Sequence, residues 1–380
     1  MKTPGPDFIR RLPENDETFG QKNIRNSWIK IDIWLILGLF LISTVGLTVL
    51  YSASGHSNSM VERQVVFFVL AYGLMLAVGQ IRLAFLERWA VWLYCIGIVL
   101  LLLTLVIGVG AKGAQRWISL GFTRFQPAEI LKIAVPLTVA AYFSHRHLPP
   151  KFIHVLVCMI IIIVPSALIL KQPDLGTAIL VIMSGVIGLF LAGLRWRYIL
   201  LTVAVVAAAA WPMWNYVMHD YQKKRVLTLV DPEADKWGAG WNILQSKTAI
   251  GSGGIEGKGW MKGTQSQLDF LPESHTDFII AVLAEEFGLQ GVLALLACYV
   301  FVIGRGLVIA WHATTTFGRI LSGSISLTFL IYVFVNMGMV SGLLPIVGVP
   351  LPMVSLGGTS LITLMMSFGL LMAVANDGRR

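Results

Sequence analysis

Long apolar runs alternate with short polar breaks along the chain from residue 31 onward. Runs such as 33–51 and 152–170 reach the ~20 residues that an α-helix needs to cross a bilayer. The pattern predicts ten membrane-spanning helices, at about 33–51, 65–81, 89–108, 127–143, 152–170, 174–193, 198–217, 277–303, 319–341 and 357–375. The expected fold is therefore all-α and polytopic, with one long polar segment, 218–276, between the seventh and eighth helices.

Composition favours a membrane protein over a soluble one. Charged residues make up only 13% of the chain and the mean hydropathy is +0.75, whereas about a quarter of a soluble domain is charged. The polar residues 1–30 predict a flexible cytoplasmic tail, followed by one membrane domain over 31–376. No cleavable signal peptide is expected, because the first apolar run is long enough to remain as a helix. The three cysteines lie in apolar runs and indicate no disulfide framework.

The distribution of Lys and Arg predicts the side of the membrane on which each loop lies, because short cytoplasmic loops carry an excess of basic residues. With the N-terminus inside, sixteen basic residues lie on the cytoplasmic side: Lys2, Arg10, Arg11, Lys22, Arg25, Lys30, Arg82, Arg88, Arg146, Lys151, Arg195, Arg197, Arg305, Arg319, Arg379 and Arg380. Five lie in short outer loops: Arg63, Lys112, Arg116, Arg124 and Lys171. We therefore predict that both termini are cytoplasmic and that the 218–276 segment is outside.

Asp277 lies where a polar stretch meets an apolar run, and it is the main candidate for a catalytic side chain. An ionised group at membrane depth is costly, so such an acid is a functional-site hypothesis by default. The competing interpretation is a capping box with Ser274, in which Asp277 only stabilises a helix start by roughly 0.3–1 kcal/mol. The residues that would follow on the same helix face are all small: Ala281, Ala284, Gly288 and Gly291. This stripe would admit a closely packed helix or leave a groove.

Glu129 and Lys132 form a second candidate site at the start of the fourth predicted helix. The proline-led sequence before Glu129 is typical of a helix start, and Lys132 lies within ion-pair reach three residues later. The pair would also be explained by mutual neutralisation of two costly charges. The basic, aromatic loop 112–118 before it is typical of an interfacial anchor. A similar proline-led start precedes Asp174, which we expect to stabilise the sixth helix.

The long outer segment carries several Trp and aliphatic residues, which predict that it is ordered: Trp237, Trp241, Ile243, Leu244 and Trp260. Its run 251–259 is dense in glycine, so this backbone either approaches an anionic group closely or serves as a flexible connector. Glu129, Asp174 and Asp277 all fall at outer ends of predicted helices, which predicts a site that opens outward. Because no nucleoside triphosphate is available there, an enzyme at this site needs a substrate that carries its own activation, such as a lipid-linked diphosphate.

Four stretches resemble motifs of the SEDS family: Phe125 to Lys132 (FQPAEILK), Gln172 to Thr177 (QPDLGT), Gly263 to Phe278 (GTQSQLDFLPESHTDF) and Asn336 to Pro352 (NMGMVSGLLPIVGVPLP). The resemblance implies ten transmembrane helices and a peptidoglycan glycosyltransferase that polymerises lipid II outside the cytoplasmic membrane and releases undecaprenyl diphosphate. It places the family's essential acid on Asp277 and its Glu–Lys pair on Glu129 and Lys132. It also implies a class B penicillin-binding protein and the elongation proteins MreB, MreC and MreD as partners, and a divalent cation, Mg or Mn, as an aid.

We therefore predict that Asp277 takes a proton from the 4-hydroxyl of the acceptor sugar or holds a divalent cation. The predicted substrate-binding residues are Lys112, Arg116, Gln126, Glu129, Lys132, Arg225, Lys247 and Lys258. Lipid II, the growing glycan strand and membrane lipids are the expected ligands, with no organic cofactor and no nucleic acid. Two alternatives remain: a flippase for the same lipid, with the membrane acids as a proton relay, and a scaffold for a single-pass partner.

Overall fold

The computed structural model describes residues 31–55, 57–111, 114–119, 124–218, 220–232, 238–267 and 273–377. The tail predicted at 1–30 and the predicted substrate-binding residue Lys112 lie outside these ranges. The helices are α1 (Ile33–Ala53), α2 (Asn58–Gly79), α3 (Leu83–Ile107), α4 (Ala128–Ser144), α5 (Phe152–Lys171), α6 (Leu175–Leu191), α7 (Trp196–Pro212), α8 (Asp220–Val230), α9 (Ala239–Gly253), α10 (Thr264–Gln267), α11 (Ile279–His312), α12 (Thr316–Val340) and α13 (Thr359–Asp377), with a π-helical segment η1 (Met213–Val217) after α7. The strands are β1 (Val109–Ala111), β2 (Ala114–Ser119) and β3 (Arg124–Phe125).

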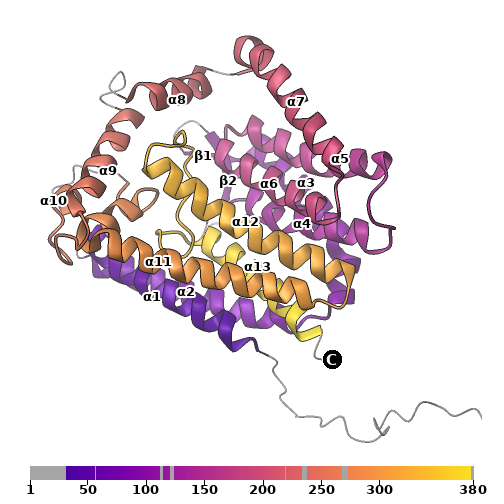
Figure 1. The fold of residues 1–380 in the computed structure, drawn as a ribbon, viewed down its shortest axis with the longest axis horizontal. Helices are drawn as coiled ribbons and strands as arrows, with labels where there is room; N and C mark the ends of the chain where they lie inside the picture. Colours follow the sequence, from indigo (N-terminus) through magenta and orange to yellow (C-terminus); the bar gives the residue numbers. More distant parts are fainter. Residues whose placement is uncertain are drawn as a thin grey trace, which may run out of the picture. The chain divides into compact units, whose positions relative to one another are not determined.

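Each of the ten apolar runs has one helix in the structure, and the prediction of a helical polytopic membrane protein is confirmed (Figure 1). Seven helices are long and apolar enough to cross a membrane: α1, α2, α3, α5, α11, α12 and α13. Helix α6 is apolar but shorter, and α4 and α7 have 17 residues each. At 1.5 Å per residue a 17-residue helix spans about 26 Å, close to the thickness of the hydrocarbon core. The number of ten spans stays a prediction.

The expectation of an all-α fold missed a small antiparallel sheet between α3 and α4, in the order β1-β2-β3. Trp117 on β2 pairs with Val109 on β1, and Ile118 pairs with Phe125 on β3. β-Branched and aromatic residues favour strands, but strands of two to six residues are too short to show a clear alternation. The sequence therefore indicated only a basic, aromatic loop at this place.

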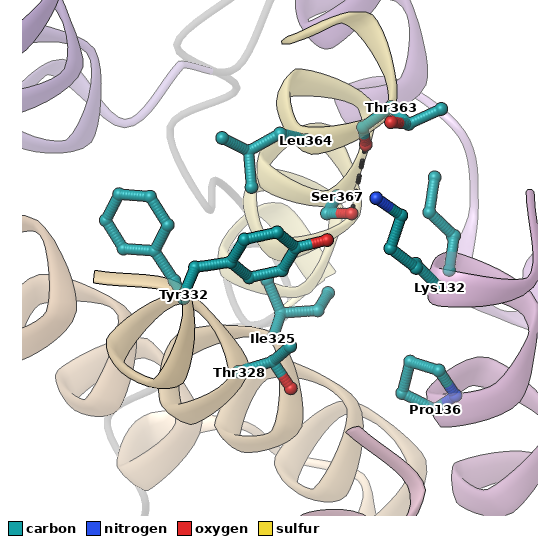
Figure 2. A pocket seen from close by; sticks show the side chains of 10 residues that line it. Lys132, Pro136, Ile325, Thr328, Tyr332, Thr363, Leu364 and Ser367 are labelled. Atoms are coloured by element: carbon teal, nitrogen blue, oxygen red, sulfur yellow. Dashed lines mark hydrogen bonds between the residues drawn. The ribbon is translucent and has the colours of Figure 1, made fainter. Parts of the chain in front are cut away.

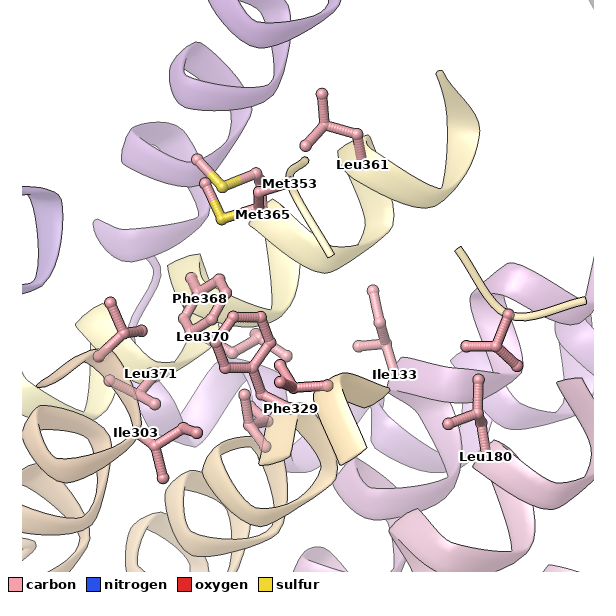
Figure 3. Close-up of a cluster of buried hydrophobic side chains, with 14 of the residues drawn as sticks. Ile133, Leu180, Ile303, Phe329, Met353, Leu361, Met365, Phe368, Leu370 and Leu371 are labelled. Atoms are coloured by element: carbon pink, nitrogen blue, oxygen red, sulfur yellow. The ribbon is translucent and has the colours of Figure 1, made fainter. Parts of the chain in front are cut away.

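The centre of the bundle is packed closely around α12 and α13. Phe329 on α12 meets Phe368 on α13 edge to face at 5.0 Å between ring centroids (Figure 3). Tyr299 on α11 meets Phe329 at 5.6 Å between ring centroids. Gly369 lets α13 lie against α2, because a Cβ there would lie 2.7 Å from the Met75 carbonyl oxygen. Small residues that admit close helix approach are typical of membrane bundles. This close packing holds in place the helices whose polar N-terminal ends form the site described below.

Helix α11 is interrupted, whereas the sequence predicted a continuous span over 277–303. Gly288 has φ 63° and ψ −162°, so the helix divides into a short first part, 279–287, and a long second part, 289–312. The outer segment is ordered where the structure describes it, as predicted, and its helix α9 packs against α11 (Figure 1). The short first part of α11 carries the Asp277 turn at its beginning.

Candidate active site

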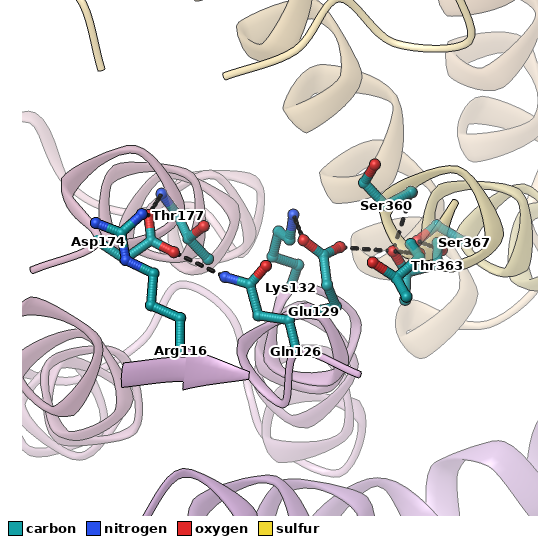
Figure 4. A network of polar contacts seen from close by, with 10 residues as sticks. Arg116, Gln126, Glu129, Lys132, Asp174, Thr177, Ser360, Thr363 and Ser367 are labelled. Carbon is teal, nitrogen blue, oxygen red and sulfur yellow. Dashed lines mark hydrogen bonds and ion pairs between the residues drawn. The ribbon is translucent and has the colours of Figure 1, made fainter. Parts of the chain in front are cut away.

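A polar network joins the N-terminal ends of α4, α6 and α13 with strand β2 (Figure 4). Pro127 precedes α4 as its N-cap, which places Glu129 in the first helical turn, as the sequence predicted. Lys132 Nζ lies 2.5 Å from Glu129 Oε1, so the predicted ion pair is present. The Thr363 hydroxyl donates to Glu129 Oε2 at 2.7 Å. Glu129 is therefore held by one cation and one hydroxyl from two different helices.

Tyr332 on α12 lies on the other side of Lys132. The Lys132 ammonium lies 5.4 Å from the centroid of the Tyr332 ring, within the range of a cation–π interaction. Figure 2 shows both side chains pointing into a small pocket between α4, α12 and α13, with Thr328 and Ser367 on its wall. The Glu129–Lys132 ion pair is thus surrounded by protein groups that take the place of water molecules.

Asp174 joins the network from the start of α6. Its Oδ1 accepts the Thr177 backbone N–H at 3.2 Å, which confirms the predicted role as a helix-stabilising acid. Its Oδ2 accepts the Gln126 side-chain amide at 2.7 Å. Arg116 lies 4.0 Å from Asp174 and donates to the carbonyl groups of Gln172, at 3.0 Å, and Pro173. Arg116 therefore ties the small sheet to the turn between α5 and α6.

These groups line a cavity of about 280 Å³ at the N-terminal ends of α4, α6 and α13. Its wall combines charged and polar side chains with glycines and apolar residues, and consists of Arg116, Trp117, Gln126, Glu129, Lys132, Asp174, Thr177, Leu180, Tyr332, Gly348, Val349, Pro350, Leu356, Gly357, Gly358, Thr359 and Ser360. The four charged side chains are two cations and two anions, so they nearly cancel. The cavity therefore offers hydrogen-bond partners and close backbone approach more than a net charge.

Asp277 lies at the rim of this cavity and is not itself part of its lining. Its Oδ2 is 3.6 Å from the place that a Cβ on Gly348 would occupy, and Gly348 lines the cavity. The Asn336 side-chain amide donates to the Asp277 carbonyl at 2.9 Å and to the Val349 carbonyl at 2.7 Å. Asn336 thereby fixes the backbone of Asp277 against the cavity wall. The Asp277 side chain itself is partly exposed.

The capping-box interpretation of Asp277 is wrong. Helix α11 begins at Ile279, and its N-cap is Phe278, not Ser274. Ser274, the proposed partner, donates instead to the Ala53 carbonyl at the end of α1, at 3.3 Å. Asp277 thus belongs to a turn, 273–278, that is bound from several sides.

The remaining predicted substrate-binding residues in the described ranges lie away from the cavity lining. Lys258 forms an ion pair with buried Glu285 at 2.7 Å. Lys247 is exposed on α9, beside Gly342 at the end of α12. Arg225 lies on α8 and is partly exposed. The structure therefore brings together Arg116, Gln126, Glu129 and Lys132, and places Asp277 beside them.

A divalent cation held by the protein alone needs several ligand side chains that converge on one point. No three His, Cys, Asp or Glu side chains of this part of the chain converge on one point. The described residues therefore do not form a closed cation site. Asp277 offers one carboxylate, and Mg²⁺ commonly binds one or two carboxylates together with phosphate oxygens of a substrate.

Sequence reasoning missed Tyr332, Thr363 and the individual role of Asn336. Tyr332 and Asn336 lie four residues apart within an apolar run, which places two polar side chains on one helix face. That spacing was a usable signal for Tyr332. Thr363 gave none, because a hydroxyl in a membrane helix commonly bonds its own backbone, as Thr363 also does with the Thr359 carbonyl at 3.1 Å.

Comparison with known proteins agrees with this description. The sequence matches the family model of FtsW, RodA and SpoVE, described as Cell cycle protein, over residues 24–380. It is 50% identical over 360 residues to the peptidoglycan glycosyltransferase MrdB of Escherichia coli K12, covering 95% of this chain and 96% of that protein. It is 35% identical over 356 residues to a probable peptidoglycan glycosyltransferase FtsW of Trichlorobacter lovleyi, covering 90% and 93%.

Two solved structures are similar in fold. The rod shape determining protein RodA of Thermus thermophilus superposes with a TM-score of 0.70 at 27% identity, covering 93% of this chain and 99% of that chain. A chain in the structure of a peptidoglycan synthase complex that coordinates polymerization and crosslinking superposes with a TM-score of 0.82 at 28% identity, covering 92% and 98%.

The fold and the site define a polytopic helical membrane protein with a charged cavity at one end of its bundle. The chain belongs to the FtsW, RodA and SpoVE family of cell cycle proteins, which is the SEDS family that its motifs predicted.

Proposed function

We propose that this protein is a peptidoglycan glycosyltransferase that polymerises lipid II on the outer side of the cytoplasmic membrane during cell elongation. The observation that carries the proposal is the position of Asp277 at the rim of the charged cavity, in a chain half identical to MrdB of Escherichia coli. This is the activity that the sequence predicted. The product that leaves is undecaprenyl diphosphate, and the polymer is the growing glycan strand.

The reaction makes two demands on the protein. The hydroxyl that attacks the donor sugar must lose its proton, and the diphosphate that leaves must be stabilised. Asp277 is the proposed general base, because its carboxylate is partly exposed and adjoins the cavity. The hydroxyl and amide groups of the cavity wall, with Arg116 and Lys132, are proposed to bind the sugar and phosphate oxygens of one lipid II.

The arrangement in the membrane follows from this proposal. The chain crosses ten times with both termini in the cytoplasm, and the cavity faces the periplasm. The partner of the synthase is a class B penicillin-binding protein, in an elongation complex with MreB, MreC and MreD. The similarity to a chain of a peptidoglycan synthase complex supports this assignment.

A divalent cation remains part of the proposal as an aid supplied with the substrate. Asp277 would be its protein ligand, and the phosphate oxygens of lipid II would provide other ligands. When bound, the ion would neutralise charge on the diphosphate.

The test is polymerisation of lipid II by the purified full-length protein and its Asp277→Asn variant. Asn keeps the size of the side chain and removes the proton acceptor, so glycan synthesis is expected to fall by at least about 100-fold, in the range typical of a lost general base. The thermal unfolding of the variant in detergent should match that of the parent. Near-normal polymer from Asp277→Asn would contradict the role. A parent that moves lipid II across vesicle membranes but makes no polymer in detergent would favour the flippase.

A further inference from the structure

The break in α11 is closed by the outer segment that follows α9. Four backbone hydrogen bonds join the two: Lys258 N to Glu285 O at 3.0 Å, Gly259 N to Glu286 O at 2.9 Å, Leu289 N to Gly254 O at 3.0 Å and Gln290 N to Ile255 O at 3.2 Å. A helix break frees carbonyl and N–H groups that cannot be left without partners at membrane depth. The outer segment therefore supplies the partners that the break at Gly288 requires.

Glycine makes this contact possible. A Cβ on Gly257 would lie 2.6 Å from the Gly288 backbone nitrogen, and a Cβ on Gly253 would lie 2.9 Å from the Ala284 carbonyl carbon. Neither position has room for a side chain. The glycine run that the sequence suggested for an anionic group, or for a connector, is thus occupied by the backbone of α11. Gly253 packs directly on the backbone of Ala284, and Ala281 and Ala284 are both buried.

Glu285 adds a charged contact at the same place. Its side chain is fully buried, and its Oε1 accepts four donors: Lys258 Nζ at 2.7 Å, Thr264 N at 2.7 Å, Gln265 N at 2.9 Å and Thr264 Oγ1 at 3.1 Å. A buried carboxylate is tolerated only with such partners. The neighbouring Glu286 accepts the Ser52 hydroxyl of α1. The end of the short first part of α11 is therefore fixed to both the outer segment and α1.

The other end of this short part carries Asp277. Residues 279–287 form about two and a half helical turns, a stiff rod between the Glu285 contacts and the catalytic turn. Two side chains hold this turn. The Asn336 amide donates to the Asp277 carbonyl at 2.9 Å, and the Ser355 hydroxyl donates to the Thr276 carbonyl at 2.6 Å. A shift of this short helix at its Glu285 end should therefore move Asp277 as well, because a helix of this length bends little.

We infer that Lys258 and Glu285 are positioning residues for Asp277, and that Lys258 acts through Glu285 and does not bind the phosphates of the substrate. This inference rests on the proposed glycosyl transfer. A misplacement of about 1 Å can lower the rate of a reaction about 100-fold. Loss of the ion pair should therefore lower kcat and leave the binding of lipid II nearly unchanged.

The experiment measures kcat and KM for lipid II with the full-length protein and the variants Lys258→Met, Lys258→Arg, Glu285→Gln and Lys258→Met/Glu285→Gln. The matched control is Lys262→Met, an exposed lysine four residues from Lys258. Lys258→Met and Glu285→Gln should each lower kcat about 10- to 100-fold, with KM changed less than about threefold. Lys258→Arg should restore most of kcat, and the double variant should be no worse than the poorer single variant. Lys262→Met should behave as the parent.

Hydrogen exchange separates positioning from general stability. In Lys258→Met, faster amide exchange should be confined to residues 264–287, with α12 and α13 unchanged. A raised KM with kcat retained would overturn the inference in favour of phosphate binding by Lys258. Loss of kcat together with faster exchange throughout the bundle, or parent-like kinetics in every variant, would also overturn it. If Glu285→Gln fails to fold, the two Lys258 variants decide. A parent without polymerase activity would refute the proposed function instead.

Discussion

At the scale of single residues, Glu129 and Lys132 show how a charge is kept inside a membrane bundle. Glu129 is 3% exposed and the Lys132 side chain 11%, so each would be costly alone. Thr363 and Tyr332 supply the remaining contacts. The two side chains therefore stabilise the fold only when both are present. Both also line the cavity.

These two roles can be separated by charge removal. Lys132→Met leaves the Glu129 carboxylate buried without its cation, which should destabilise the protein by roughly 3–5 kcal/mol. The double variant Glu129→Gln/Lys132→Met removes both charges and should recover most of the thermal unfolding temperature in detergent. Polymerisation of lipid II should stay low in both variants, because the cavity has lost two binding groups. Recovery of fold and polymerisation together in the double variant would show that the pair is only structural.

At the scale of elements, the connector 341–358 between α12 and α13 brings backbone to the turn 273–278, which carries Asp277. Val349 accepts the Asn336 amide, and the Leu356 N–H donates to the His275 carbonyl at 3.0 Å. Gly348 has φ +74° and lies beside Asp277. Irregular backbone of this kind is tolerated at membrane depth only where protein or a water-filled cavity covers it, and here it forms the cavity wall.

Gly348→Ala should therefore affect catalysis more than stability. Alanine at a positive φ costs roughly 1–2 kcal/mol, and the new methyl group would lie 3.6 Å from Asp277 Oδ2. That contact displaces water and substrate from the carboxylate. We expect polymerisation to fall about tenfold or more while the thermal unfolding temperature drops by only a few degrees. Gly55→Ala after α1 is the matched control, because Gly55 also has a positive φ, +61°, and a Cβ there meets nothing within 4 Å. Equal effects of the two variants would contradict the prediction.

The sequence predicted most of the elements because membrane helices are long and apolar. It also predicted the Glu129–Lys132 pair, because that contact depends on local helical spacing. It failed where the structure depends on contacts between distant segments. Gly288 appeared as one more small residue in a stripe, yet it breaks α11 because residues 254–259 bind there. Lys258 was likewise predicted to bind phosphate, because its ion-pair partner Glu285 is 27 positions away in the sequence and could not be recognised.

At the scale of the whole molecule, the cavity is formed at one end of helices that are far apart in the sequence. Seven helices are clear candidate spans, whereas α4, α6 and α7 have only 17 residues each. Helix α4 lies almost wholly inside the bundle, so it needs few residues that face lipid. If α4 did not cross, Lys151 would lie outside the cell. The proposed location of the cavity therefore depends on whether the short helices cross.

Cysteine labelling in intact cells tests this topology. The native Cys95, Cys158 and Cys298 are first replaced by Ala, and single cysteines are placed at exposed positions. With ten spans, Ser252→Cys should react with a membrane-impermeant maleimide, and Lys151→Cys should react only after the membrane is opened. If only the seven long helices crossed, both results would be reversed.

Two control positions make that outcome decisive, because each lies on the same side of the membrane whether seven or ten helices cross. Ser59→Cys, at the start of α2, should be labelled in intact cells, and Arg82→Cys, between α2 and α3, should be protected. Glycan synthesis by each variant shows that the labelled protein is folded. Labelling of Lys151→Cys in intact cells, with both controls as expected, would mean that α4 does not cross. Glu129 and Lys151 would then lie on the same side of the membrane, and the ten-span arrangement behind the proposed outward-facing cavity would be wrong.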